Sequence, residues 1–143
     1  MKRLIDVVAF GLLASISFTA CSDSAPAGPS AEAVGVWVAT VTGQENGVDL
    51  TQTLTLTVSN DETFTYAANI NGTAMAVNSG TWVVAQGIFI GTPSTCQVIN
   101  NETGNLETAT CGADNTVRLS MSGISGNTWT AVAGEVTLTF TRQ

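Results

Sequence analysis

The sequence predicts an all-β domain, built as an antiparallel up-and-down β-barrel of about eight strands. Apolar residues and threonines alternate strictly from Leu54 to Val58, which is the period of a strand with one buried face. Residues 34–143 contain no stretch in which apolar residues recur with a helical period over three turns. Asn71-Gly72 is the dipeptide most typical of a two-residue hairpin turn. Barrel closure would remove exposed strand edges, and a two-sheet β-sandwich is the alternative architecture.

Turn signals separate the segments that have the pattern of a strand. The Asn-Gly turn sets Tyr66 opposite Val77, so that apolar residues pair on one face. A three-residue loop at 60–62 sets Val58 opposite Phe64, whereas a two-residue loop would pair residues of opposite faces. The expected strands cover residues 34–42, 49–59, 63–70, 73–84, 87–91, 115–121, 128–133 and 135–142, with room for one more hairpin between 92 and 114.

Residues 1–20 have the pattern of an export signal. Lys2 and Arg3 form a short basic start, and the twelve residues of Val7–Phe18 carry no charge. This length suits the apolar core of a secretory signal and is too short to cross a bilayer.

The end of this signal determines what becomes of Cys21. The sequence Phe18-Thr19-Ala20-Cys21 resembles the lipobox of bacterial lipoproteins. The resemblance implies that a diacylglyceryl group is attached to Cys21 and that the chain is cut before it. Two or more acyl chains make a stable anchor in a membrane, which here would be that of the bacterial cell envelope. Because Ser, not Asp, follows the cysteine, the same resemblance favours the outer membrane. Ordinary cleavage nearby, with Cys21 an unmodified thiol, is the alternative.

Residues 21–33 are expected to form the lipidated cysteine and a flexible tether. They are rich in Ser, Ala and Pro and contain no large apolar residue before the domain, so they cannot bury enough surface to fold. Residues 34–143 then form the β domain, and their number suits one domain.

The charge of the exported chain limits its partners. After cleavage it keeps Arg118 and Arg142 as its basic residues against ten acidic residues, which gives a formal charge of −8. Such a surface repels phosphate backbones and anionic lipid heads. We therefore expect no nucleic-acid partner, and we expect attachment to a membrane only through the lipid anchor.

The sequence contains no recognisable catalytic set. With no His, the Ser-His and Cys-His nucleophile pairs and His-containing zinc sites are excluded. The acidic residues fall mostly in turns, where they are expected to be solvated rather than to converge in a cleft. No Gly-rich phosphate loop is present. We expect no enzymatic activity, no cofactor and no metal.

Residues at both ends of the domain resemble the calycin pattern of lipocalins and lipocalin-like bacterial lipoproteins. Gly35 and Trp37 open the first strand as Gly-x-Trp, and Arg142 ends the last strand. The resemblance implies a barrel in which this arginine packs over this tryptophan. Strand parity agrees, because Arg142 shares the apolar face of Leu138 and Phe140, so it should point inward and stack on the indole.

Cys96 and Cys111 are expected to form a disulfide. With Cys21 lipidated they are the only thiols left, and export through an oxidising compartment favours their pairing. A ladder that pairs them would also set Val98 opposite Ala109, around a turn within 100–105. Two free buried thiols are the alternative.

The residues expected inside the barrel are bulky enough to fill it, as an interior of about eight strands requires. A filled interior favours a non-enzymatic, membrane-tethered protein of the envelope that serves structure or protein interaction. The alternative function is a carrier that binds a small hydrophobic ligand in the barrel mouth. The inward residues are Leu54, Leu56, Phe64, Tyr66, Met75, Val77, Leu119, Met121, Leu138 and Phe140.

Overall fold

The structure is a computed structural model, and it describes residues 26–27, 31–133 and 135–143. These residues form strands and two single-turn 3-10 helices, which confirms the prediction of an all-β domain. The elements are β1 (Pro26–Ala27), β2 (Gly35–Glu45), β3 (Val48–Val58), β4 (Thr63–Ile70), β5 (Thr73–Ala85), β6 (Ile88–Ile99), β7 (Leu106–Ala109), η1 (Ala113–Asn115), β8 (Val117–Ser120), η2 (Met121–Gly123), β9 (Ile124–Ser125), β10 (Thr128–Ala133) and β11 (Val136–Arg142).

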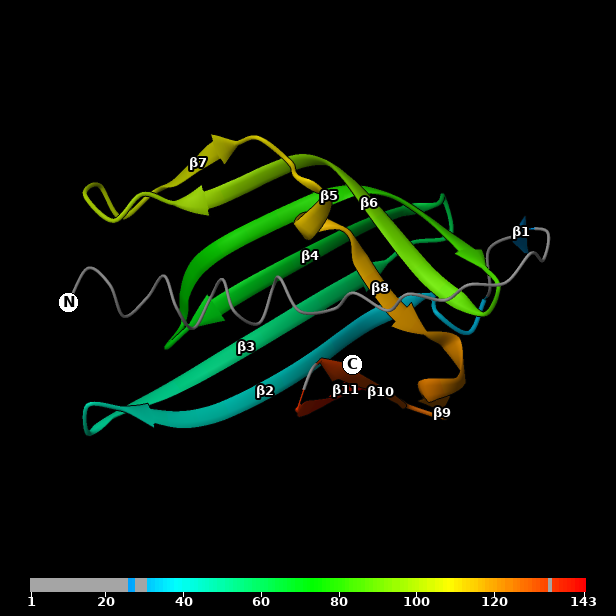
Figure 1. The fold of residues 1–143 in the computed structure, drawn as a ribbon, viewed down its shortest axis with the longest axis horizontal. Helices are drawn as coiled ribbons and strands as arrows, with labels where there is room; N and C mark the ends of the chain where they lie inside the picture. The colour runs from blue at the N-terminus through cyan, green and yellow to red at the C-terminus, as the bar shows by residue number, and fades with distance from the viewer. Residues whose placement is uncertain (1–25, 28–30, 134) are drawn as a thin grey trace.

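The strands form one antiparallel sheet in the order β7-β6-β5-β4-β3-β2-β11-β10-β9. Two further strands lie off this path, because β1 pairs with β5 and β8 pairs with β6. Neighbours in the sheet are mostly neighbours in the chain, as predicted for an up-and-down arrangement. In Figure 1 the long strands β2 to β6 form one curved layer, and β8 crosses the view toward β9, β10 and β11.

The ladder does not close around the described part of the chain. β9 ends the order on one side and β7 and β8 end it on the other, so the predicted closed barrel is not confirmed. The first and last long strands are neighbours as expected, but β11 pairs with β2 only through Thr141 with Val38 and Arg142 with Trp37. Between β8 and β10 the chain forms η2 and the two-residue strand β9. β8 pairs with β6 and β9 pairs with β10, so no ladder joins the two edges of the sheet. The sheet is therefore strongly curved and open.

The two predicted turns have the expected geometry. Asn71 and Gly72 have φ angles of 49° and 81°, as a two-residue turn between twisted strands requires. Across the preceding loop, Val58 pairs with Phe64, as the three-residue loop predicted.

The predicted pairing of Tyr66 with Val77 is wrong. β5 contains an extra residue, Met75, opposite β4, and this bulge shifts the rest of β5 by one position. Tyr66 therefore pairs with Asn78, and Val77 moves to the outer face. The shift places the Asn78 side chain inside, where it is 2% exposed.

β6 is longer than predicted and absorbs part of the region left open between 92 and 114. It continues past Pro93, which lies opposite Gly80 at a second irregularity of the ladder, where its missing N–H is tolerated. The hairpin to β7 closes through the N–H of Asn100, which donates to the carbonyl of Asn105 at 2.8 Å.

The segment predicted as a tether contributes to the fold. Within residues 21–33, Pro26 and Ala27 form β1 and pair with Ala85 and Val84 of β5. Ala33 is fully buried. Contacts of the β domain therefore begin before residue 34.

The buried core has two parts. The larger cluster contains Trp37, Trp82 and Trp129, and the end of the sheet that they occupy is called the tryptophan end below. The smaller cluster, Ile70 and Met75, lies toward the opposite end. That end, called the hairpin end below, holds the turns after β2, β4 and β6, which lie together at the left of Figure 1.

Candidate functional site

Gly35, Trp37 and Arg142 meet at the tryptophan end, as the sequence predicted. The guanidinium carbon of Arg142 lies 4.3 Å from the centroid of the Trp37 ring. Its Nη1 and Nη2 atoms donate to the carbonyls of Val34 and Glu32, each at 2.8 Å. Gly35 has a φ of 144°, and a Cβ atom there would lie 3.5 Å from Nη1 of Arg142. The arginine therefore binds the entering chain to the last strand.

Aromatic side chains fill this end. Trp37 and Phe89 each contact Trp129 edge to face, with ring centroids 5.3 and 5.5 Å apart, and Phe89 stacks on Trp82 at 5.4 Å. All three indole N–H groups donate to backbone carbonyls, at 2.8 to 3.0 Å. A buried ring whose only polar atom is satisfied is a packing element, so we place no ligand at this end.

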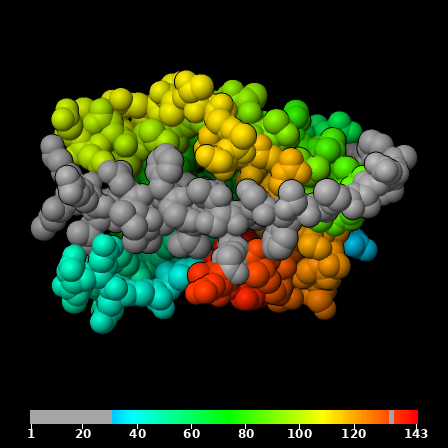
Figure 2. Space-filling view, viewed as in Figure 1, coloured from blue at the N-terminus to red at the C-terminus, as the bar shows by residue number. Residues whose placement is uncertain are grey.

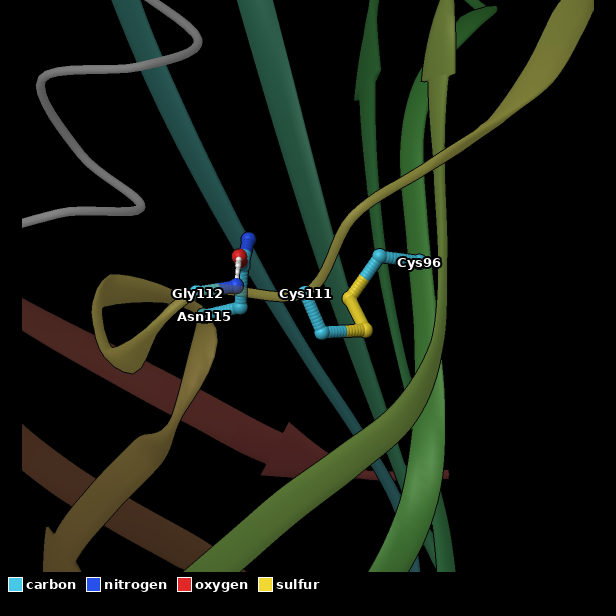
Figure 3. The surroundings of a disulfide bond; sticks show 4 residues. All are labelled: Cys96, Cys111, Gly112 and Asn115. Atoms are coloured by element: carbon cyan, nitrogen blue, oxygen red, sulfur yellow. Dashed lines mark hydrogen bonds between the residues drawn. A yellow bond between two sulfur atoms is a disulfide. The ribbon is translucent and has the colours of Figure 1, made fainter.

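The disulfide is confirmed, with the Cα atoms of Cys96 and Cys111 5.4 Å apart. The predicted ladder around it is wrong by two positions, because Cys96 pairs with Ala109 and Cys111 reaches it from beyond the end of β7 (Figure 3). The next turn is held by Asn115, whose Oδ1 accepts from the N–H of Gly112 at 2.8 Å. The bond thus fastens the crossing from β7 to β8 onto the inner face of β6.

The inner face of the sheet also contains buried polar side chains. One cross-strand row runs through Leu56, Tyr66, Asn78 and Cys96 on β3 to β6. Tyr66 and Asn78 are direct partners in this row, and each is 2% exposed. Nearer the hairpin end, Gln52 of β3 lies on the same inner face and is 3% exposed.

A row of alanines separates these two polar positions. Ala39, Ala68 and Ala76 lie on β2, β4 and β5, in the row next to that of Tyr66. All three are buried and share their row with Leu54 of β3. These side chains are smaller than Leu54 in the same row, and Ala39 and Ala68 belong to the same buried cluster as the tryptophans.

The polar side chains of this face lack partners. The hydroxyl of Tyr66, Oδ1 of Asn78 and both amide atoms of Gln52 are buried without a hydrogen bond. Leaving such an atom unpaired costs about 1–3 kcal/mol, so native proteins rarely keep four of them on one face without a role. Burial raises the pKa of Tyr66. Its hydroxyl therefore remains a neutral donor at any physiological pH.

A pocket of about 230 Å³ reaches the inner face from the hairpin end. Glu45 stands in its lining, and Oε2 of this carboxylate is buried without a partner. Leu50 and Ile99 pack against Ile70 and Met75 nearby. Figure 2 shows the β2–β3 hairpin (cyan) and the β6–β7 hairpin (yellow-green) on opposite flanks of this end. The pocket is lined by Val41, Thr42, Gly43, Gln44, Glu45, Leu50 and Gln52.

We call Gln52, Tyr66 and Asn78, together with the alanine row, the inner polar site. Sequence reasoning placed Tyr66 inside but assigned it to the core. Gln52 was missed although its parity is that of Leu54 and Leu56, so a signal was present. Asn78 could not be found, because only the bulge at Met75 turns it inward.

The structure bears on few of the predictions about the export signal, the lipid anchor and metal ions. Cys21 and residues 1–20 lie outside the described residues. In the ranges that are described, no group of three or more His, Cys, Asp or Glu residues could hold a metal ion. No helix in those ranges is long and apolar enough to span a membrane. No protein-family model matches the sequence, and no curated protein matches it either.

Proposed function

We propose that this protein is a non-enzymatic lipoprotein of the bacterial cell envelope that carries a small molecule on the inner face of its β domain. The observation that carries the proposal is the inner polar site, where three uncharged side chains have buried polar atoms without partners and one of them, Gln52, lines a pocket. A bound molecule would supply the missing hydrogen bonds. A purely structural domain would gain stability from apolar residues at the same positions.

This proposal replaces structure or protein interaction as the favoured role. That role rested on an interior filled by bulky side chains. The tryptophan end is filled in this way, but the hairpin end has a pocket lined by Gln52, and the inner face has buried polar atoms without partners at Gln52, Tyr66 and Asn78.

For the architecture, we propose an open, lipocalin-like barrel. Its support is the stacking of Arg142 on Trp37 and the antiparallel pairing of β2 with β11. A two-sheet sandwich would be favoured if β8 and β9 proved to belong to separate layers.

Native mass spectrometry of the protein purified from its own membrane tests the carrier function. We expect a reproducible small-molecule adduct that is lost on denaturation and that rebinds after refolding. Absence of any adduct, together with a co-purifying protein, would favour the interaction role instead.

The proposed lipid anchor rests on the resemblance of residues 18–21 to a lipobox, and the proposed location in the outer membrane rests on the Ser that follows Cys21. The change Cys21→Ser should release the protein from membranes or leave the precursor uncut. A mature-sized band of this variant that still sediments with membranes would contradict the anchor. Separation of the inner and outer membranes then tests which membrane holds the unaltered protein.

A further inference from the structure

We propose that the ligand is an elongated, uncharged molecule with hydrogen-bonding groups near both ends of an apolar segment. This inference rests on the proposed carrier function and goes beyond it by naming the class of molecule. It follows from where the polar atoms lie, what separates them, and which charges are near.

The polar atoms lie at two levels of the inner face. Tyr66 and Asn78 share one cross-strand row with Leu56 of β3. Gln52 stands four residues earlier on β3, which is about 13 Å along the strand. One small polar group cannot bond both levels, but a molecule that lies along the strands can reach both.

The row of side chains between the two levels is apolar and consists mainly of small residues. Ala39, Ala68 and Ala76 are the small members of the row that separates them, and Leu54 completes it. An apolar segment that lies on these alanines buries hydrocarbon against hydrocarbon. The groups at its two ends then reach Gln52 on one side and Tyr66 with Asn78 on the other.

The charges nearby favour a neutral ligand. The inner polar site consists of a phenol and two amides, and none of them can balance a buried ion. Arg142 donates to backbone carbonyls at the tryptophan end, so it does not provide a positive charge for a ligand at the inner polar site. Glu45 in the pocket lining repels an anion that enters from the hairpin end. A cation that passed Glu45 would still lose its hydration at the two amides without a counter-charge.

The experiment uses three compounds with the same ten-carbon chain: decanediol, decanedioate and diaminodecane. Binding to the membrane-purified full-length protein is measured by native mass spectrometry and by the shift of the unfolding temperature. We expect decanediol to bind at least tenfold more tightly than the dianion or the dication. Decanol, which has one hydroxyl, should bind about 3- to 10-fold more weakly than decanediol, because it lacks one hydrogen bond.

Variants then locate the ligand. Tyr66→Phe and Gln52→Leu should each weaken decanediol binding by about 3- to 10-fold, and either change should reduce the advantage of decanediol over decanol. Ala68→Leu should block the apolar segment and affect both alcohols. Gln97→Leu is the matched control on the outer face of β6 and should leave binding unchanged.

The outcomes separate the two proposals. A native adduct that is an acid or an amine, or tight binding of decanedioate, would overturn the neutral class and leave the carrier function standing. Equal binding of decanol and decanediol would overturn the two-level arrangement. If no compound binds, no native adduct is found, and a crystal structure shows only water at Gln52, Tyr66 and Asn78, both proposals fail.

Discussion

Arg142 covers the Trp37 indole at 4.3 Å and is the cross-strand partner of the same residue. The contact joins the first long strand to the last, over the short stretch where β11 still pairs with β2. Because only two residue pairs form this junction, side-chain contacts have a larger share in holding it than in the longer ladders.

The first prediction concerns this junction. Arg142→Ala and Trp37→Ala should each lower the free energy of unfolding, and the double variant should lose less than the sum of the two. The coupling should be about 0.5–2 kcal/mol, the usual value of a cation–π contact. Chemical denaturation of the four proteins measures it. Arg118→Ala is the charge-matched control and should change stability by less than about 0.5 kcal/mol. Strictly additive losses would mean that the stacked geometry contributes nothing.

The second prediction concerns the disulfide. The double change Cys96→Ala with Cys111→Ala should lower the free energy of unfolding by about 3 kcal/mol, because the bond closes a loop with a sequence separation of 15. Peptide mapping without reductant should recover the two cysteines in one crosslinked peptide. Recovery of both as alkylated thiols would disprove the bond in the exported protein.

The third prediction concerns Gly80 at the irregularity between β5 and β6. A Cβ atom at this position would collide with the carbonyl oxygen of Thr92 and lie 2.7 Å from the Cα atom of Pro93. Gly80→Ala should therefore cost about 1–3 kcal/mol, as overpacking does. Gly43→Ala is the control, since a Cβ there meets nothing within 4 Å. Thermal unfolding of both variants measures the difference, and equal stability would show that the two strands can move apart there without cost.

The fourth prediction uses the fact that Tyr66 is the only tyrosine in the chain. Its pKa is raised in the folded state by burial, whereas in the unfolded chain it ionises near 10.0. The stability that the neutral phenol contributes is complete below pH 10.0 and falls above it, because only the unfolded state can release the proton. The free energy of unfolding should therefore decline by about 1.4 kcal/mol for each pH unit above that value.

Tyr66→Phe is the control for this pH dependence. The exported chain has no Lys or His, so the variant should lose the alkaline slope almost completely. The phenolate absorbance of the unaltered protein provides a second measurement, because it should appear only as the protein unfolds. A phenolate signal near pH 10 in folded protein would show that the hydroxyl reaches solvent.

Much of the fold could be predicted because period and turn chemistry act locally. The alternation around Leu54 placed β3, and the positive φ angles that Asn71 and Gly72 adopt readily placed the turn after β4. The junction of Trp37 with Arg142 followed from parity and from the resemblance together. These features depend on residues close in sequence or on the ends of the domain.

The candidate site depended on features that no local pattern reveals. Asn78 faces inward only because Met75 is an extra residue in β5, and an apolar residue at the bulge gives no sign of it. The extent of closure depends on how far β11 follows β2, which is set by curvature and by the crossing at η2. Gln52 is different, because it has the strand parity of Leu54 and Leu56 in the sequence. Its burial could therefore have been predicted, together with the free-energy cost of burying an amide.

The hydrogen bonds from Arg142 to Glu32 and Val34 also determine where the chain enters the domain. That entry lies at the tryptophan end, and β1 pairs with the last residues of β5 at the same end. If Cys21 carries the anchor, the tryptophan end, which aromatic side chains fill, is the end held near the lipid. The 11 residues of β2 then place the hairpin end about 35 Å farther along the strand direction. If the inner polar site also binds a ligand, as proposed, that ligand would be exchanged with the aqueous compartment or with another protein rather than drawn directly from the bilayer.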